Sequence, residues 1–310
     1  MRYKNAGVDL DRHRQVHKLA EGALGGARGL YVRWVEVGGV EVALHVDGVG
    51  TKTLWLLQQG QLETAGWDCV FVNINDVVCD GFKTVAAVDY IAVSPGLEDK
   101  AGEVLRGVSK ALEIVGAALL GGEVAIMPEV VSGVDVVCTV LATREARPSE
   151  VSPGDYIIGL ASTGPHANGY SLLRRLFRLD EKICGAPAWE VLLKPVADYS
   201  PVLRLYGEGL IKAAAHITGG SFTKLKRALG PHGADIRLGE KPCWALEAVR
   251  RGVPLEEAYR VFNMGVGMAL FTDRPEDVVR RAGDFGLDAR VIGVVKPGGA
   301  IKVDEVVFTS

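Results

Sequence analysis

The chain has 310 residues, of which 48% are apolar and 24% are charged, which is typical of a protein that buries a large core. Its net charge of −3 comes without a basic stripe or an acidic tail, which argues against a nucleic-acid partner. No apolar stretch reaches the roughly 20 residues that span a bilayer, and the polar N-terminus argues against a secretory signal. We therefore expect a cytoplasmic protein with no membrane partner.

The cysteines and amides give two further expectations. The five cysteines are widely spaced and form no C-x-x-C pair, which predicts reduced thiols rather than a disulfide framework or a zinc site. The chain has only five asparagines and four glutamines, and a scarcity of these heat-labile residues is typical of heat-adapted proteins.

Strands and helices alternate along the first half of the chain. Apolar residues at Ala101, Val104, Leu105 and Val108 recur at helical spacing, which predicts a helix over 98–116. The remaining patterns predict strands at 40–46, 84–93, 119–128 and 135–143, and helices at 53–61 and 65–80.

A polar segment rich in proline separates this half from the next. We expect domains at residues 1–145 and 156–310, joined by a linker at 146–155. The second half predicts helices at 169–178, 201–215 and 275–285, strands at 156–162, 289–295 and 300–308, and a helix, glycine turn and strand over 255–271. The expected fold is α/β (α+β), with a mixed sheet flanked by helices in each domain.

The segment "HVDGVGTK" (45–52) joins a predicted strand to a predicted helix through a glycine turn. Thr51 separates Gly50 from Lys52, so the Walker pattern is not met. Asp47 is a hard oxygen ligand suited to magnesium, while Lys52 offers a charge to phosphate. The turn therefore predicts a site for a metal and a phosphate together; a turn with a capping aspartate is the alternative.

Other acidic residues could complete such a site. Asp76 follows Asn75 on a largely apolar helix, and Asp80 one turn later either extends the site or faces solvent. Asp89 lies in the middle of an apolar strand, where a carboxylate needs a cation or an arginine. Glu123 follows two glycines at the end of another strand.

Two glycine turns in the second half predict binding of an anionic substrate. The first, "STGPHANGY" (162–170), precedes a predicted helix, and His166 within it is either an acid–base group or a turn residue without a chemical role. The second is "HITGGSF" (216–222). We expect His45 and His216 only to form hydrogen bonds beside turns, and Asn263 to set a turn.

These motifs occur in the order found in one family. "YKNAGVD", "DGVGTK", "ND", "GGE…MP", "GPHANGYSLLR", "HITGGSF" and "FNMGVGM" together resemble the phosphoribosylformylglycinamidine cyclo-ligases, also called aminoimidazole ribonucleotide synthetases. The resemblance runs from residue 3 to the last strand. "DGVGTK" and "GGE" also resemble a wider superfamily that includes thiamine-monophosphate kinase and selenophosphate synthetase.

The resemblance implies a homodimer in which the N-terminal sheets join into a barrel. It also implies that ATP, with Mg2+, phosphorylates the amide oxygen of formylglycinamidine ribonucleotide. The amidine nitrogen of the same molecule then attacks that carbon, closes the imidazole ring and expels phosphate.

The resemblance also implies roles for individual residues. Catalytic roles fall to Asp47, Lys52 and His166. Contacts with ATP are expected from Lys4, Asn5, Gly48, Gly50, Thr51, Lys52, Asn75 and Asp76, and contacts with the metal from Asp47, Asp76, Asp89 and Glu123. Contacts with the substrate are expected from Ser162, Gly164, His166, Asn168, Gly169, Thr218, Gly219 and Gly220.

The sequence departs from the family pattern in the segments 25–31 and 195–206 and at several single positions, among them Asp80, Val124, Ile126 and Ser221. Two other functions therefore stay open. One is a phosphotransferase of the same superfamily, such as a thiamine-monophosphate kinase; selenophosphate synthetase is disfavoured because no cysteine precedes Cys69. The other is a dimer that binds nucleotide without catalysis.

Overall fold

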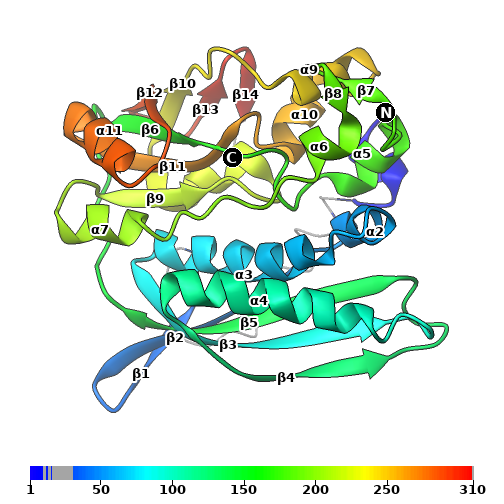
Figure 1. The fold of residues 1–310 in the computed structure, drawn as a ribbon. Helices are drawn as coiled ribbons and strands as arrows, with labels where there is room; N and C mark the ends of the chain where they lie inside the picture. Colours follow the sequence, from blue (N-terminus) through cyan, green and yellow to red (C-terminus); the bar gives the residue numbers. More distant parts are fainter. Residues whose placement is uncertain (10–11, 13–14, 16–30, 309–310) are drawn as a thin grey trace.

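The computed structural model describes residues 1–9, 12, 15 and 31–308. Figure 1 shows two sheets, one above the other, with helices α2 (Lys52–Gln58), α3 (Leu62–Cys79) and α4 (Lys100–Val115) between them. The expected combination of two mixed sheets flanked by helices is thus confirmed. Within the described residues, no helix is both long and apolar enough to cross a membrane.

The first sheet, which we call the N-terminal sheet, has the strand order β1-β2-β5-β3-β4. Only β3 and β4 run parallel; the other neighbours are antiparallel. Its strands are β1 (Trp34–Val37), β2 (Val40–Gly48), β3 (Phe82–Val93), β4 (Ala118–Ile126) and β5 (Val134–Arg144).

Helices α3 and α4 cover one face of this sheet, and two glycines set how closely they pack. A Cβ atom on Gly66 would lie 2.0 Å from Val104 O, and one on Gly107 would lie 1.9 Å from Glu63 O. Glycine at both crossing positions therefore lets the two backbones touch. The predicted apolar stripe of α4 faces this contact, since Ala101, Val104 and Val108 are buried.

The other face of the N-terminal sheet is not covered by the described residues, and it is apolar. On β2, Leu44 and Val46 are 66% and 60% exposed, while the intervening His45 faces α3. Val88 and Tyr90 of β3 are exposed in the same way. We call the exposed side chains Val35, Val37, Leu44, Val46, Val88 and Tyr90 the open face. An apolar surface of this kind normally binds another protein surface.

The C-terminal sheet has the order β14-β13-β10-β12-β6-β11-β9 and is also mixed, because β10 and β13 run parallel. Its strands are β6 (Tyr156–Ala161), β9 (Ala213–His216), β10 (Gly233–Ile236), β11 (Val266–Thr272), β12 (Ala289–Lys296), β13 (Ile301–Val303) and β14 (Val306–Phe308).

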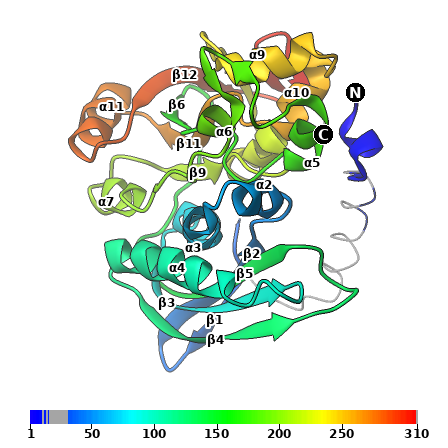
Figure 2. The same ribbon diagram turned by 45° about the vertical axis from the view of Figure 1, so that its right-hand side comes forward.

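Seven α-helices of the described chain accompany the C-terminal sheet. Figure 2 shows α7 and α11 at one end of the sheet and α5, α6, α9 and α10 at the other. Their bounds are α5 (Tyr170–Leu176), α6 (Ala188–Leu192), α7 (Val202–Gly207), α8 (Lys226–Leu229), α9 (Cys243–Arg250), α10 (Leu255–Val261) and α11 (Pro275–Asp284). Short elements complete the chain: η1 (Tyr3–Ala6), η2 (Ser221–Leu225), β7 (Lys182–Ile183) and β8 (Ala186–Pro187).

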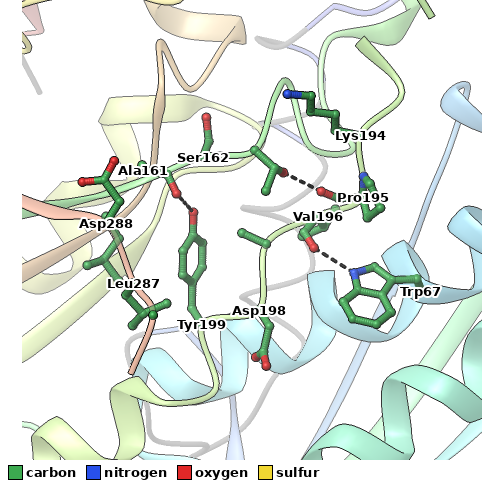
Figure 3. Close-up of a pocket in the computed structure, with 14 residues that line it drawn as sticks. Trp67, Ala161, Ser162, Lys194, Pro195, Val196, Asp198, Tyr199, Leu287 and Asp288 are labelled. Atoms are coloured by element: carbon green, nitrogen blue, oxygen red, sulfur yellow. Dashed lines mark hydrogen bonds between the residues drawn. The ribbon is translucent and has the colours of Figure 1, made fainter. Parts of the chain in front are cut away.

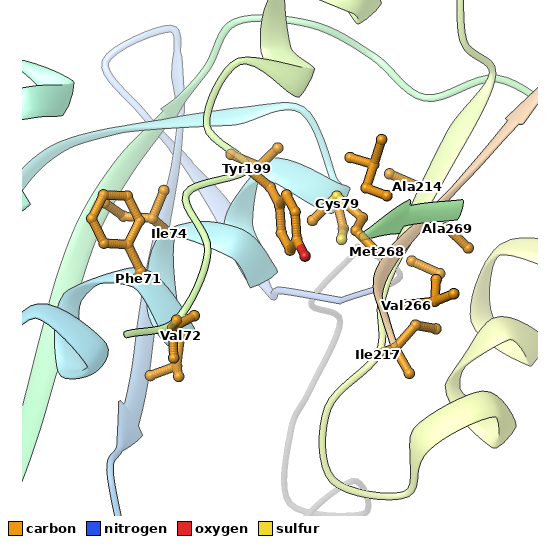
Figure 4. Packing of buried hydrophobic residues seen from close by; sticks show 14 of the residues in the cluster. Phe71, Val72, Ile74, Cys79, Tyr199, Ala214, Ile217, Val266, Met268 and Ala269 are labelled. Atoms are coloured by element: carbon orange, nitrogen blue, oxygen red, sulfur yellow. The ribbon is translucent and has the colours of Figure 1, made fainter. Parts of the chain in front are cut away.

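Helix α3 lies between the two halves of the chain and is buried on nearly all sides, so it packs against both halves. Figure 4 shows Phe71, Val72 and Ile74 of α3 on one side of Tyr199 and Met268 of β11 on the other. These side chains belong to one continuous hydrophobic core that extends into both sheets. The polar residues of α3 that lie in this core therefore need partners from both halves of the chain.

Most of the predicted elements are confirmed, but two are wrong. The predicted helix 201–215 ends early: α7 stops at Gly207, Gly209 has a φ of +65°, and Ala213–His216 is strand β9. Alanine favours helices, but pairing with β11 overrides that preference. The predicted strand 300–308 is a hairpin of two strands, because Asp304 adopts a φ of +51° between them.

The expectation that all cysteines are reduced is also wrong. Cys184, between β7 and β8, forms a disulfide with Cys243 at the start of α9, and their Cα atoms are 5.8 Å apart. A sequence separation of 59 residues gives no hint of this pair, since only the fold brings the hairpin to α9. Cys69, Cys79 and Cys138 are free and buried.

Candidate functional site

The predicted glycine turns meet where the two halves of the chain face each other. The hydroxyl of Thr51, in the first turn, lies 3.1 Å from that of Ser171, which follows the turn at 162–170. A Cβ atom on Gly219 would lie 3.4 Å from Asn168 Oδ1, so the two C-terminal turns are also neighbours. The structure thus brings together three segments that are far apart in sequence.

The N-terminal arm lies against the same turns. The backbone N–H of Tyr3 donates to Glu257 Oε1 at 2.7 Å, and Arg175 of α5 donates to Asn5 O. The ammonium of Lys4 is exposed and pairs with Asp9 at 2.9 Å. Lys4 and Asn5 therefore flank α5, and their expected contact with ATP stays a prediction.

Asp76 is the centre of a buried polar cluster. Its Oδ1 lies 2.7 Å from His216 Nδ1, and its Oδ2 lies 3.4 Å from His45 Nε2. Burial would raise the pKa of Asp76, but the charge of Lys224 and the hydrogen bonds from both histidines outweigh burial and hold the pKa well below its usual value. Asp76 is therefore ionised.

Asp47 lies close enough to Asp76 for the two carboxylates to repel. Burial, and then the charge of Asp76, raise the pKa of Asp47. Its Oδ1 accepts the N–H of Gly48 at 2.8 Å. Two neighbouring carboxylates with hard oxygen donors, one of them held ionised, fit a divalent cation such as Mg2+, because a cation would remove their repulsion.

Asp89 is buried on the same face of the sheet but further away. The strand register pairs Asp47 with Cys138 and Cys138 with Asp89, so two strand spacings, roughly 10 Å, separate the two aspartates. Within the described chain both carboxylate oxygens of Asp89 lack a hydrogen-bond partner, and burial raises the pKa of Asp89. A Cβ atom on Gly122 would lie 2.5 Å from Asp89 Oδ1, so the carboxylate needs a glycine beside it.

Glu123 lies apart from the other acidic residues. It pairs with Tyr90 in the register of β3 and β4, and Tyr90 belongs to the open face. No group of three or more histidine, cysteine, aspartate or glutamate side chains in the described residues is arranged to hold a metal. Within one chain the structure thus brings Asp47 and Asp76 together, but neither Asp89 nor Glu123 joins them.

His166 is buried beside this cluster. Its Nε2 accepts the N–H of Thr163 at 3.3 Å, while its Nδ1 has no partner among the described residues. Burial, and then the charges of His216 and Lys52, hold the pKa of His166 well below its usual value, so the ring is neutral. The Nε2 of His216 also lacks a partner. Two ring nitrogens therefore have no hydrogen-bond partner within the described chain where the turns meet.

The remaining turn residues mostly support the backbone. The amide of Asn263 donates to Gly164 O at 2.8 Å and accepts the N–H of Gly265 at 2.9 Å, which confirms its expected role in a turn. Ser221, one of the departures from the family pattern, has a φ of +47° and donates to Phe262 O at 2.7 Å. The serine therefore adds a bond at a position that favours glycine.

Two residues expected to contact ATP are occupied within the chain. Lys52 is completely buried, forms an ion pair with Asp68 at 2.6 Å and donates to Lys194 O at 2.7 Å. The amide of Asn75 donates to Ala197 O at 2.9 Å and accepts the N–H of Tyr199 at 3.0 Å. Their contact with ATP stays a prediction, and the structure places both against residues 194–199.

A cavity of about 470 Å3 lies on the other side of residues 194–199. Figure 3 shows Trp67, Tyr199 and Leu287 around it, with Asp198 and Asp288 at its edges. Ser162 also lines it. The volume is in the range of small-molecule sites. Tyr199 lines the cavity, and the centre of its ring lies 6.1 Å from that of His166 and 6.3 Å from that of His216.

Four residues of the site were not predicted from the sequence to act there: His45, His216, Lys224 and Asp68. The two histidines follow or precede glycine turns, which was the only available signal. Lys224 lies in η2, two residues after the end of the motif "HITGGSF". Asp68 lies in α3 among apolar residues, and its complete burial could have suggested a partner.

The sequence left two interpretations of Asp80 open, a part of the metal site or a residue that faces solvent, and the structure supports neither. It is buried, and its Oδ2 accepts the N–H groups of Tyr31 and Val32, both at 2.8 Å. The carboxylate thus anchors the backbone that leads into β1, which explains an acidic residue at this departure from the family pattern.

Comparison with known proteins places this geometry in context. The family model described as "AIR synthase related protein, N-terminal domain" matches residues 30–143, and the corresponding C-terminal model matches residues 152–305. The phosphoribosylformylglycinamidine cyclo-ligase of Saccharolobus solfataricus is 39% identical over 279 residues, which cover 87% of this chain and 85% of that protein. The enzyme of the same name from Methanocaldococcus jannaschii is 35% identical, with 94% and 91% covered.

Solved structures share the fold at much lower identity. Thiamine monophosphate kinase from Aquifex aeolicus superposes with a TM-score of 0.66 at 19% identity, covering 98% of both chains. The hydrogenase maturation protein HypE in complex with ATP superposes with a TM-score of 0.63 at 16% identity, covering 91% of this chain and 85% of that one.

Proposed function

Because the chain belongs to the phosphoribosylformylglycinamidine cyclo-ligase family, we propose that it converts formylglycinamidine ribonucleotide and ATP into aminoimidazole ribonucleotide, ADP and phosphate. This is a step of purine biosynthesis that forms a C–N bond. ATP phosphorylates the amide oxygen, the amidine nitrogen attacks the same carbon, and phosphate leaves as the ring closes.

One observation carries the proposal. The carboxylate of Asp76, from the "ND" motif, lies 2.7 Å from the ring of His216, from the "HITGG" motif. These residues come from opposite halves of the chain, so the contact joins the expected nucleotide side to the expected substrate side. A ring closure that needs two ligands side by side depends on such a junction.

Asp47 and Asp76 would hold Mg2+, which supplies positive charge to the phosphate groups of ATP when bound. Asp89 and Glu123, the other expected ligands, lie elsewhere in one chain, and a second subunit is the most direct way for Glu123 to reach a nucleotide. The backbone from Gly48 to Thr51 would shape the phosphate pocket, with Lys4 and Asn5 folding over it from the arm.

The two C-terminal turns would receive the ribose phosphate of the substrate. Gly164, Asn168, Gly169, Thr218, Gly219 and Gly220 allow backbone N–H groups to approach an anion closely, and Ser162 lies at the edge. His166, held neutral, accepts the N–H of Thr163 at Nε2 and therefore carries its own hydrogen at Nδ1, which can donate a hydrogen bond to an oxygen of the substrate. The expected contribution of His166 is this hydrogen bond, while positioning supplies most of the rate.

The open face supports a homodimer. Exposed valine, leucine and tyrosine side chains on one whole face of the N-terminal sheet cost free energy in water. Covering them with the same face of a second copy would give the barrel that the family resemblance implies. We also propose a cytoplasmic location; a disulfide is compatible with it in heat-adapted organisms.

The decisive experiment is a coupled assay with the purified protein, formylglycinamidine ribonucleotide, ATP and magnesium. We expect ADP and aminoimidazole ribonucleotide to form together in equal amounts. ADP release that does not depend on that substrate would favour a phosphotransferase instead. Tight ATP binding without turnover would favour a nucleotide-binding dimer that does not catalyse.

A further inference from the structure

Residues 194–199, which we call the crossing segment, run between α3 and the turn that carries His166. Figure 3 shows the crossing segment with Trp67 of α3 on one side and Ala161 and Ser162 on the other. Four side chains of the N-terminal half hold it: Lys52, Trp67, Asp68 and Asn75. We call these four residues the clamp.

Each member of the clamp binds the backbone of the crossing segment. Lys52 donates to Lys194 O at 2.7 Å, and the indole N–H of Trp67 donates to Val196 O at 2.8 Å. The Oδ1 of Asp68 accepts the N–H of Val196 at 2.7 Å. Asn75 reaches the next two peptide units, at Ala197 and Tyr199.

The crossing segment in turn holds the substrate turn. The hydroxyl of Thr163 donates to Pro195 O, and the hydroxyl of Tyr199 donates to Ala161 O at 2.7 Å. A Cβ atom on Gly267 would lie 1.9 Å from Tyr199 Oη and 2.6 Å from His166 Cε1, so Tyr199 and His166 crowd the same point. A shift of the crossing segment therefore moves His166.

The surroundings of Lys52 leave no direction open for a phosphate. Its ammonium, with no exposed surface, lies 2.6 Å from Asp68 Oδ2, donates to Lys194 O and lies 5.5 Å from the centre of the Tyr170 ring. A carboxylate, a carbonyl and an aromatic face thus surround the three N–H groups.

We propose that Lys52 and Asp68 are positioning residues: their buried ion pair fixes the crossing segment, and through it His166, relative to the nucleotide turn. This inference rests on the proposed function, and it replaces the expected contact between Lys52 and the transferred phosphoryl group. The lysine of "DGVGTK" acts on the substrate side of the site, through the backbone at residue 194.

Two variants of Lys52, one with and one without a compensating change at Asp68, distinguish positioning of the crossing segment from contact with the phosphoryl group. In Lys52→Met, the buried carboxylate of Asp68 loses its partner, which displaces the crossing segment. In Lys52→Met/Asp68→Asn, no charge is left unpaired, and the Asn oxygen still accepts the N–H of Val196. If Lys52 positions, the double variant recovers activity that Lys52→Met has lost, although both lack the lysine.

We expect kcat of Lys52→Met to fall about 100-fold and that of the double variant to return to within about tenfold of the parent, with an unchanged KM for ATP in the double variant. Hydrogen exchange at residues 194–199 should speed up in Lys52→Met and slow again in the double variant. A folded double variant as inactive as Lys52→Met, with Asp68→Asn near the parent, would overturn the inference in favour of a phosphoryl contact.

Trp67→Phe decides the matter if the Lys52 variants do not fold, because it removes one N–H donor and keeps the aromatic ring. Faster exchange at residues 194–199 with a severalfold lower kcat and an unchanged KM for ATP is the expected result. Faster exchange with an unchanged kcat would contradict the inference. A parent protein without cyclo-ligase turnover would instead defeat the proposed function, so the two failures are distinguishable.

Discussion

Two buried polar clusters lie near Tyr199, and they differ in how many of their polar atoms have partners within the chain. In the clamp, the amide of Asn75 and the ammonium of Lys52 form hydrogen bonds with backbone groups of the chain itself. The second cluster, which we call the histidine cluster, consists of His45, Asp76, His166 and His216. It leaves His166 Nδ1 and His216 Nε2 without a partner in the described chain.

The difference separates two tasks. Buried polar atoms without a partner cost free energy, so a protein keeps them where a ligand or a proton will use them. Polar atoms that are paired within the chain fix the geometry instead; in the clamp, Asp68 Oδ2 accepts no hydrogen bond but lies 2.6 Å from the ammonium of Lys52. We infer that the histidine cluster takes part in the reaction and that the clamp fixes the geometry of the site.

The largest effect is expected in the histidine cluster, for Asp76→Asn. The variant keeps the shape of the side chain but removes the charge that holds His216, His45 and a divalent cation. We expect turnover to fall about 10³-fold in the coupled assay. The free energy of unfolding, measured by denaturant titration, should fall as well, because the lowered pKa of Asp76 means that its ionised form stabilises the fold. Asp80→Asn, at the end of the same helix, is the matched control and should stay within about threefold of the parent, because the amide oxygen still accepts both backbone N–H groups. Equal losses in the two variants would contradict a special role for Asp76.

The second prediction concerns the neighbouring carboxylate. Asp47→Asn removes one of the two charges that repel each other in the free protein, and with it one proposed ligand of Mg2+. We expect the magnesium-dependent affinity for ATP to fall about 10- to 100-fold, measured by calorimetry with and without magnesium. Because burial and Asp76 raise the pKa of Asp47, protons compete with the metal, and affinity in the parent should weaken as the pH falls through that raised pKa. An unchanged affinity would reassign Asp47 to capping the turn.

The third prediction concerns the clamp. Asn75→Ala leaves Ala197 O and the N–H of Tyr199 without their partners. Each buried group that loses its hydrogen bond costs about 1–3 kcal/mol, so for the two groups we expect a loss of about 2–6 kcal/mol in the free energy of unfolding. Denaturant titration measures it. A variant as stable as the parent but inactive would place Asn75 with the histidine cluster rather than with the clamp.

The same comparison explains what could be predicted from the sequence. Elements with regular apolar spacing, such as α4, and strands bounded by glycine turns, such as β2, follow from local pattern. The family motifs led to both glycine turns and to Asp47 and Asp76, which the structure places together. Local pattern failed at β9, where three consecutive alanines form a buried strand because β11 lies beside them.

The roles inside the motifs could not be predicted, because they depend on partners far away in the sequence. Lys52 and Asn75 look like nucleotide contacts in a list of motifs, yet their partners lie 142 and 122 residues further along the chain. The disulfide between Cys184 and Cys243 could not be predicted for the same reason. Sequence spacing tells which residues are reactive, but only the fold tells which of them are already occupied.

The smallest effect is expected at Asp89, a third group with unused atoms, which lies in the N-terminal sheet away from both clusters. Burial raises its pKa above the value of about 3.9 that it has in the unfolded chain. The folded protein therefore binds this proton more tightly, and its stability falls as the pH rises through the interval between the two pKa values. Asp89→Asn removes this loss. We expect the variant to melt above the parent at pH 7 and together with it below pH 4, measured by calorimetry without magnesium or nucleotide.

Magnesium and ATP test what the carboxylate is for. If Asp89 is retained to bind the metal, the parent gains more thermal stability from magnesium and ATP than Asp89→Asn does. The difference between the two melting temperatures then becomes smaller or changes sign. If both proteins gain equally, Asp89 contributes nothing to the nucleotide site. Its unused oxygens, which lie beside Gly122 on the face of the sheet opposite the open face, would then cost stability without serving the nucleotide site.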